Sequence, residues 1–203
     1  MEIVDQAAWD VGCHAQRLVG DYYTHMAALH VASDPRAANF APPLRPGQQV
    51  PLLDVPRGDG TNHTFHFNHF LKLVRDPQLT GDFKKAWLAS SLLTIGDALG
   101  THNYFGHAPE AELIRHLRNG VAHKNRFAFH PSVIERRSGL LRHPAHNRRY
   151  TTVLTMREYT IDTHLQGTEV LFGYGGAAVL LDILTCLGWH LTRTGTGFAP
   201  GTA

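Results

Sequence analysis

The most apolar stretch of the chain, residues 171–191, constrains the fold more than any other feature. A membrane span needs about 20 consecutive, mostly apolar residues. Asp182 interrupts this stretch, and Gly173, Gly175 and Gly176 punctuate its start. These interruptions favour a helix buried in a bundle of other helices over a membrane span. The apolar residues that mark this last helix are Leu180, Ile183, Leu184, Leu187 and Trp189.

Earlier segments supply further helices for the bundle. Residues 1–32 form the first predicted helix, residues 61–75 the second and residues 80–100 the third, which has the clearest periodicity. A fourth begins at Pro109, in the first-turn position that proline favours. Together these patterns predict a mainly α chain, a bundle of about five helices. The predicted buried face of the third helix comprises Phe83, Trp87, Leu88, Ser91, Leu92, Ile95 and Leu99.

Two segments interrupt the helical pattern. Residues 33–60 hold six of the eleven prolines and predict a long Pro-rich loop. Residues 126–172 change to an alternating period, which predicts a small β-hairpin-like insertion before the last helix. Within this insertion we expect a short strand at residues 127–129 and a returning strand at residues 169–172. We expect residues 1–203 to form a single domain.

Composition narrows the class of protein. The content of 43% hydrophobic and 18% charged residues argues against disorder. Cys13 and Cys186 are too few for a disulfide framework and suit a reducing compartment. The segment Met1–Asp10 is acidic and lacks the apolar core of a secretory signal. We therefore expect a cytoplasmic protein with no membrane segment.

Charge is unevenly distributed along the chain. The formal net charge is only +2, yet residues 101–150 carry nine Lys and Arg against three Asp and Glu. A basic segment of this kind favours a polyanionic partner such as RNA. The alternative is a loop of solvated arginines, and the sequence alone supports both.

The segment Leu113–Arg126 carries the chemistry within this basic region. Arginine offers a planar fork of donors to phosphate. Histidine, with an unperturbed pKa of about 6.5, can take or give a proton near neutral pH. Arg118, Asn119 and His123 thus provide the groups that RNA cleavage without a metal needs, because the 2′-hydroxyl is itself the nucleophile. In the alternative reading, Arg118 is an ordinary surface charge and His123 a favourable residue at a helix C-terminus. The helical seam of the segment is Ile114, Leu117 and Val121.

Arg118, Asn119 and His123 in an amphipathic helix resemble the Arg-x4-His motif of the HEPN superfamily, the higher eukaryotes and prokaryotes nucleotide-binding domain. The wider strings at residues 96–105 and 123–127 are similar to a bacterial and plasmid-borne branch, and the resemblance covers residues 80–130 best. It implies an HEPN-like helical bundle that forms a homodimer, with two Arg/His pairs in one cleft. It also implies a metal-independent endoribonuclease without cofactor, typical of toxins and defence effectors, with a possible neutralising partner protein. Some members only bind nucleotides, nucleic acid or protein partners, and this non-catalytic alternative stays open.

Neighbouring residues extend the candidate site. Arg115, Lys124 and Arg126 are candidates for binding the RNA backbone, a contact that carries no sequence information. Tyr104, with Phe105 beside it, is a candidate for stacking on a base. The alternative for both aromatic residues is packing against the motif helix.

Two further residues are candidates for supporting roles. Asp97 is unusual in a mostly apolar helix, and it can hydrogen-bond Arg118 or cap a neighbouring helix. His116 follows Glu112 by four residues, so the two side chains can pair on one helical face. We expect His116 to support the site rather than to act in catalysis.

Fifteen histidines require that a metal site be considered. His63, His66 and His69 have the spacing to lie along one face of a helix and would be the ligands of a metal-dependent hydrolase. The sequence lacks a His-Glu-x-x-His string, a Cys-x-x-Cys pair and an EF-hand loop. We therefore expect no metal and no cofactor.

Overall fold

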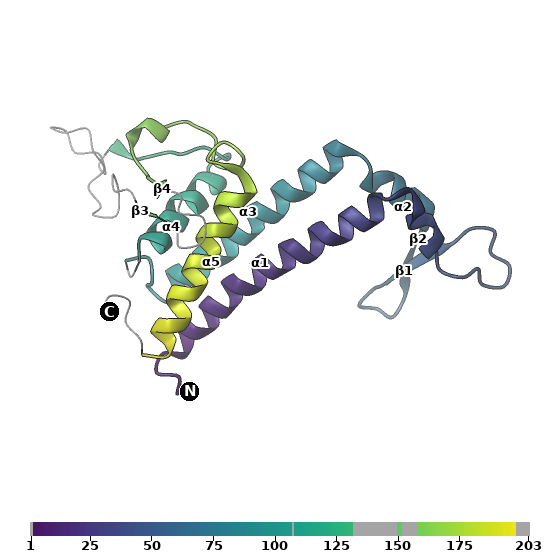
Figure 1. Ribbon diagram of the computed structural model, residues 1–203, viewed down its shortest axis with the longest axis horizontal. Coiled ribbons are helices and arrows are strands. Elements are labelled where there is room, and N and C mark those ends of the chain that lie inside the picture. The colour runs from purple at the N-terminus through teal and green to yellow at the C-terminus, as the bar shows by residue number, and fades with distance from the viewer. Residues whose placement is uncertain (1, 107, 132–149, 152–157, 198–203) are drawn as a thin grey trace. The chain divides into compact units, whose positions relative to one another are not determined.

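The computed structural model describes residues 2–106, 108–131, 150–151 and 158–197, and it is mainly helical (Figure 1). This confirms the predicted class, a helical bundle with a small β component. The helices are α1 (Gln6–Ser33), α2 (Phe67–Val74), α3 (Pro77–Thr101), α4 (Pro109–Ala122) and α5 (Gly176–Gly195), with short 3-10 helices η1 (Pro35–Phe40) and η3 (Thr163–Leu165). The strands are β1 (Leu52–Pro56), β2 (Asn62–His66), β3 (Tyr150–Thr151) and β4 (Glu158–Tyr159).

The chain divides into two compact units, which are described separately. Unit 1 comprises residues Met1–Asp21 and Lys85–Ala203, and unit 2 comprises residues Tyr22–Lys84. Both α1 and α3 contribute residues to each unit. The prediction of a single domain over residues 1–203 stays a prediction.

Unit 1 contains the hydrophobic core. Side chains from α1, α3, α4 and α5 form one buried cluster. Of the predicted apolar residues of α5, Ile183, Leu184 and Leu187 are completely buried and supply its centre, whereas Trp189 is exposed. Asp182 is also buried, and its carboxylate accepts a hydrogen bond of 3.0 Å from the hydroxyl of Tyr159. The single charge in the apolar stretch thus joins α5 to β4.

Helices α1 and α5 pack unusually closely in unit 1. A Cβ atom added to Gly188 would lie 2.8 Å from Cγ of Gln16 and 3.0 Å from the carbonyl oxygen of Gly12. Such distances leave no room for a side chain, so the two backbones approach each other through glycines.

The predicted helices agree with the structure to within a few residues where their apolar faces are buried. α1 begins at Gln6 rather than residue 1, and α3 extends slightly beyond the predicted residues 80–100. α4 begins at Pro109, as predicted. α5 is longer than its apolar marker residues suggest, because it begins at Gly176 and ends at Gly195.

The predicted β insertion is present in reduced form. β3 and β4 pair antiparallel, whereas residues 126–129 and 169–172 are joined only by an isolated bridge between Arg126 and Glu169. The predicted strands at residues 127–129 and 169–172 are therefore wrong. Residues 132–149 and 152–157, the remainder of the predicted insertion, lie outside the described residues.

Unit 2 overturns two predictions. The predicted Pro-rich loop at residues 33–60 contains η1 and β1, and the predicted helix at residues 61–75 begins with β2. β1 and β2 form an antiparallel hairpin whose turn contains Gly60 at φ 82°. The carboxylate of Asp59 accepts from the backbone nitrogen of Thr61 at 2.9 Å and stabilises this turn. Asp59-Gly60 is a hairpin signal that outweighs the helical spacing of the following aromatic residues.

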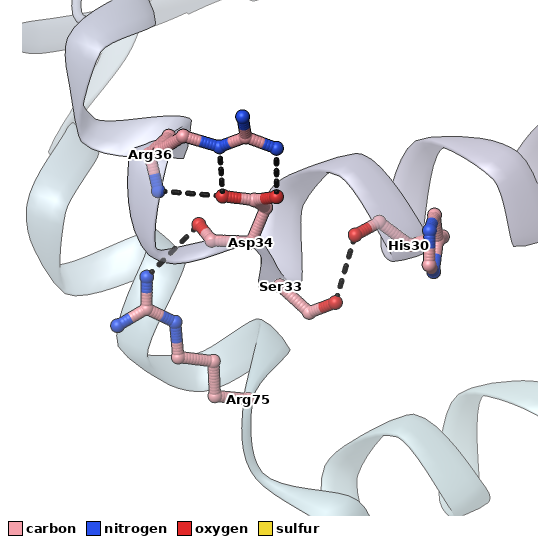
Figure 2. A network of polar contacts seen from close by, with 5 residues as sticks. All are labelled: His30, Ser33, Asp34, Arg36 and Arg75. Carbon is pink, nitrogen blue, oxygen red and sulfur yellow. Dashed lines mark hydrogen bonds and ion pairs between the residues drawn. The ribbon is translucent and has the colours of Figure 1, made fainter.

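A local polar network joins three segments of unit 2 (Figure 2). Asp34 accepts three hydrogen bonds from Arg36, from the backbone nitrogen at 2.7 Å and from the guanidinium at 3.0 and 2.9 Å. These bonds lower the pKa of the Asp34 carboxyl. The backbone oxygen of Asp34 accepts from Arg75, which follows α2, at 3.2 Å. The network thus fixes the junctions between α1, η1 and α2.

Candidate functional site

Helix α4 positions the motif residues. Pro109 occupies its first turn, where Glu110 and Glu112 complement the positive end of the helix dipole. Leu113, Ile114 and Leu117 are buried, so the opposite part of the helix surface faces outward. Arg115, Arg118 and Asn119 are partly exposed on that surface.

Arg118 extends from α4 to α3 and pairs with Asp97. Its Nε and Nη2 atoms donate to Oδ1 of Asp97 at 3.1 and 2.7 Å, which confirms one of the two predicted roles of Asp97. The close approach depends on Gly96, because a Cβ atom there would lie 2.6 Å from Cγ of Arg118. Arg118 also donates to Oδ1 of Asn119 at 3.3 Å. Three of the five guanidinium N–H groups are thus used, and the other two make no hydrogen bond with any residue that the structure describes.

An open hollow of about 440 Å³ lies beside this pair, between α3 and α4. It has the volume of a small-molecule site. The motif residues Arg118 and Asn119 form part of its wall, with the predicted residues Arg115 and Asp97. The other lining residues are Gly96, Gly100, Thr101 and Phe105.

Arg115 is held at the hollow by the buried carboxylate of Glu112. Its Nε donates to Oε1 of Glu112 at 2.8 Å, and its Nη2 forms an ion pair with the same oxygen. Nε2 of His116 lies 3.3 Å from Oε1 of Glu112, which confirms the predicted pair. His116 is itself buried, with its ring edge-on to Phe129. This geometry agrees with a supporting role for His116, through the orientation of Arg115.

His123 occupies the C-cap of α4. Its backbone nitrogen donates to the carbonyls of Asn119 and Gly120 at 3.0 and 3.2 Å, so its backbone ends the helix. The side chain is exposed. Its imidazole makes no hydrogen bond or ion pair with any residue that the structure describes, and it does not line the hollow. One chain therefore places Arg118 and Asn119 in the wall of the hollow but not His123.

The turn after His123 has a strained backbone and is held by hydrogen bonds to other residues of unit 1. Lys124 and Asn125 have φ values of 63° and 59°, in the left-handed region that side chains other than glycine seldom adopt. Asn125 anchors the turn, because its Oδ1 accepts from the nitrogen of Leu171 at 2.7 Å and its Nδ2 donates to Glu169 at 2.8 Å. Backbone strain at a site that the surroundings enforce is often linked to function. Here it fixes the direction of the chain directly after His123.

The two cations near this turn differ in availability. Lys124 is exposed and unpaired among the described residues. Arg126 is also exposed, but its Nη1 donates to the carbonyl oxygen of Gly167 at 2.7 Å. Neither residue lines the hollow. Lys124 is therefore the freer of the two candidates for contacting an RNA backbone.

Tyr104 has the surroundings of a packing residue rather than a stacking platform. The residue is only 5% exposed, and its hydroxyl donates to the carboxylate of Asp5 at 2.8 Å. Burial and the hydrogen bond to Asp5 raise the pKa of Tyr104 to about 12. A buried ring offers no free face to a base, so we exclude Tyr104 from the substrate-binding residues.

Among the wall residues that were not predicted as site residues, Gly96 and Phe105 have the clearest roles. Gly96 had only a weak signal, because the same helix contains Gly81, whose added Cβ atom would meet nothing within 4 Å. Phe105 had none that distinguished it from Tyr104, since both are aromatic and adjacent in the same short connection. The turn that follows α3 decides which of the two side chains enters the core and which lines the hollow.

The rival metal site is not assembled. His63 and His66 belong to β2 and His69 to α2, so the prediction that they share one helical face is wrong. Among the residues that the structure describes, no group of three or more His, Cys, Asp or Glu side chains could hold a metal ion. In the same part of the chain, none of the helices combines the length and apolar character required to cross a membrane.

A second hollow, of about 490 Å³, lies in unit 2. Asp34 and Arg36 form part of its wall, but they are paired with each other in the network of Figure 2. Val31 and Phe40 contribute exposed apolar surface. The hydrogen bonds between Asp34 and Arg36 stabilise local structure, and they do not indicate a bound ligand.

Comparison of the chain with protein-family models, with curated proteins and with solved structures finds no match. Arg118, Asn119 and His123 are the residues on which the HEPN resemblance rests, and that relationship stays a prediction.

Proposed function

We propose that this protein is a metal-independent endoribonuclease of HEPN type. The observation that carries the proposal is the arrangement on α4. Arg118 has two N–H donors left beside an open hollow, and the exposed imidazole of His123 follows at the end of the same helix. These groups supply phosphate binding and proton transfer, which are the requirements for cleaving RNA through its own 2′-hydroxyl.

In the proposed reaction, one imidazole removes the proton from the 2′-hydroxyl. The 2′-oxygen forms a bond to the adjacent phosphorus, and the bond from phosphorus to the 5′-oxygen breaks. A second imidazole, in its protonated form, gives its proton to the departing 5′-oxygen. Arg118 binds the charged phosphoryl oxygens, and Asn119 orients the phosphate or Arg118. The products are a 2′,3′-cyclic phosphate and a 5′-hydroxyl end.

This mechanism requires a homodimer. One imidazole cannot be both base and acid in a single concerted step, and His123 does not line the hollow of its own chain. A second copy related by two-fold symmetry would bring another His123, with its own Arg118, to a shared site. The expected partners are thus RNA and a second copy. A toxin or defence role, with a neutralising partner protein, belongs to the same proposal.

The decisive experiment measures cleavage of labelled single-stranded RNA in EDTA. We expect His123→Ala to lower the rate by at least about a hundredfold, the usual contribution of a general acid or base. His69→Ala, which removes an exposed histidine of α2, is the matched control and should retain the parent rate. Equal rates for His123→Ala and the parent protein would refute the proposed chemistry.

A mixing experiment tests the shared site. Parent protein is equilibrated with increasing amounts of His123→Ala at constant total concentration. If each active site needs two imidazoles, activity should fall with the square of the parent fraction. A linear fall would show that each chain acts independently.

The second candidate function is RNA or nucleotide binding without cleavage. It is favoured by one observation, namely that Asp97 and Glu112 already pair with Arg118 and Arg115 and reduce the free positive charge. In that case RNA should bind to the parent and to His123→Ala equally, and binding should weaken as salt concentration rises. No cleavage product should form with either protein.

A further inference from the structure

Phe105 is the large apolar side chain in the wall of the hollow between α3 and α4. It is partly buried against the core, and the edge of its ring lies over Gly100. A Cβ atom at Gly100 would lie 3.3 Å from Cε2 of that ring. The absence of a side chain at Gly100 therefore gives the ring its place beside the hollow.

The turn that follows α3 determines which of two adjacent aromatic side chains, Tyr104 or Phe105, enters the core. Asn103 has φ 57°, and the nitrogen of Tyr104 donates to the carbonyl of Leu99 at 2.8 Å. Tyr104 enters the core and bonds Asp5, while the next residue, Phe105, lines the hollow. Tyr104, fixed in the core, thus holds Phe105 in place beside the hollow.

The wall combines two kinds of surface that a nucleotide requires. Arg118 provides donors for phosphate, and Phe105 provides an aromatic surface for a base. The volume of about 440 Å³ is within the range of sites for small ligands. We propose that the hollow holds one unpaired ribonucleotide, with its phosphate on Arg118 and its base stacked on Phe105.

This inference rests on the proposed function and specifies its substrate class. A base inside a duplex is paired and stacked on its neighbours, so it cannot also stack on a protein ring. The substrate is therefore RNA that is single-stranded at the cleavage site. Stacking tolerates every base, because each has an aromatic face, so sequence preference should be weak and should favour the larger purines.

The test measures binding of two small probes, adenosine 5′-monophosphate and ribose 5-phosphate, to the full-length protein by calorimetry. Neither probe contains a bond that the proposed reaction cleaves. The parent should bind the nucleotide about tenfold more tightly, because one stacked base contributes roughly that factor or more. Phe105→Leu should remove this preference and leave the affinity for ribose 5-phosphate unchanged. Phe105→Tyr should restore it, and Phe70→Leu, at an exposed phenylalanine of α2, should have no effect.

The outcomes separate this inference from the nuclease proposal. A preference for the nucleotide that depends on Phe105 supports the base site, even if no RNA is cleaved. Equal affinities for the two probes, or a preference that survives Phe105→Leu, overturn the base site, even if RNA is cleaved. Cleavage of a duplex as fast as the same strand alone would also overturn the assigned substrate class.

Discussion

Unit 1 and unit 2 differ most in how much apolar surface each removes from water. The buried cluster that forms the hydrophobic core lies in unit 1. Within unit 2, every residue of which the structure describes, only Ala37 and Leu71 are buried hydrophobic residues. Ten large hydrophobic side chains of unit 2 are exposed, namely Tyr23, Val31, Phe40, Leu44, Val50, Val55, Phe70, Leu73, Leu79 and Phe83.

The difference shows that the two units are stabilised by different forces. Burial of apolar surface is the dominant favourable term for unit 1. Unit 2 depends more on turns and local hydrogen bonds, such as those of Asp34 and Asp59. All three tryptophans, Trp9, Trp87 and Trp189, belong to unit 1. Tryptophan fluorescence therefore reports unit 1, and amide NMR signals can report unit 2.

The largest expected effect comes from emptying the core. Leu184 is completely buried in α5, and Leu184→Ala should lower the free energy of unfolding by about 2–5 kcal/mol. Leu73→Ala, at a side chain of unit 2 that is 40% exposed, is the control and should cost less than about 1 kcal/mol. Denaturant unfolding followed by tryptophan fluorescence and by circular dichroism measures both. Similar losses for the two variants would contradict the contrast between the units.

Two helical glycines sharpen the same contrast. Gly188→Ala would force α1 and α5 apart in unit 1 and should cost about 1–3 kcal/mol, the usual penalty for overpacking. Gly81→Ala lies in the part of α3 that belongs to unit 2, and its Cβ would meet nothing within 4 Å. That variant should stabilise by about 0.5–1 kcal/mol, because alanine favours a helix more than glycine does. Thermal unfolding should therefore shift in opposite directions, and a stabilising Gly188→Ala would disprove the close packing.

The same contrast explains which elements could be predicted from the sequence. Periodic apolar residues such as Leu92, Ile95 and Leu184 are periodic because one face of each helix is buried, so α3 and α5 were recognisable. In unit 2, the three-residue spacing of His63, His66 and His69 resembled a helix, but these residues are exposed and no buried face maintains that pattern. The hairpin depends instead on the turn at Asp59 and Gly60.

The candidate site was predictable in its chemistry but only in part in its geometry. Arg118 and Asp97 lie 21 positions apart, and their pairing follows from the packing of α4 on α3 over Gly96. The separation of His123 from the hollow depends on where α4 ends. The placement of Tyr104 in the core and of Phe105 in the wall of the hollow depends on one turn. None of these has a periodic signal, since each depends on tertiary contacts of single residues.

Alkaline pH should affect unit 1 through Tyr104. Its folded pKa of about 12 lies above the ordinary value of 10.0, so the folded state favours the protonated phenol. The stabilisation is complete below pH 10 and is lost as pH rises through about 12. Tyr104→Phe should cost about 1.5 kcal/mol at neutral pH, the value of a hydrogen bond to a charged group, and less at pH 12. The exposed Tyr23→Phe of unit 2 is the control, and a cost for Tyr104→Phe that does not change with pH would contradict this assignment.

Acid should produce the smallest effect, and it should begin in unit 2. The pKa values of Asp34, Asp54 and Asp59 are lowered, chiefly by hydrogen bonds from Arg36, Thr64 and Thr61 respectively. A lowered pKa means that the ionised form stabilises the fold, so this contribution is present above the ordinary value of 3.8 and is lost as pH falls below it. Asp59 is exposed, and Asp34 and Asp54 are only partly buried, so their interactions stay in contact with water and contribute little.

Hydrogen exchange at the amides of Arg36 and Thr61, which donate to Asp34 and Asp59, measures this acid response directly. Protection should fall below pH 4 at both amides while the tryptophan fluorescence of unit 1 is still native. Asp34→Asn keeps an acceptor oxygen but removes the charge, so it should weaken protection at Arg36 above pH 4 and abolish its dependence on acid. Asp10→Asn, at an exposed aspartate of α1 in unit 1, is the matched control. Simultaneous loss of both signals would show that the two units respond to acid as one cooperative structure.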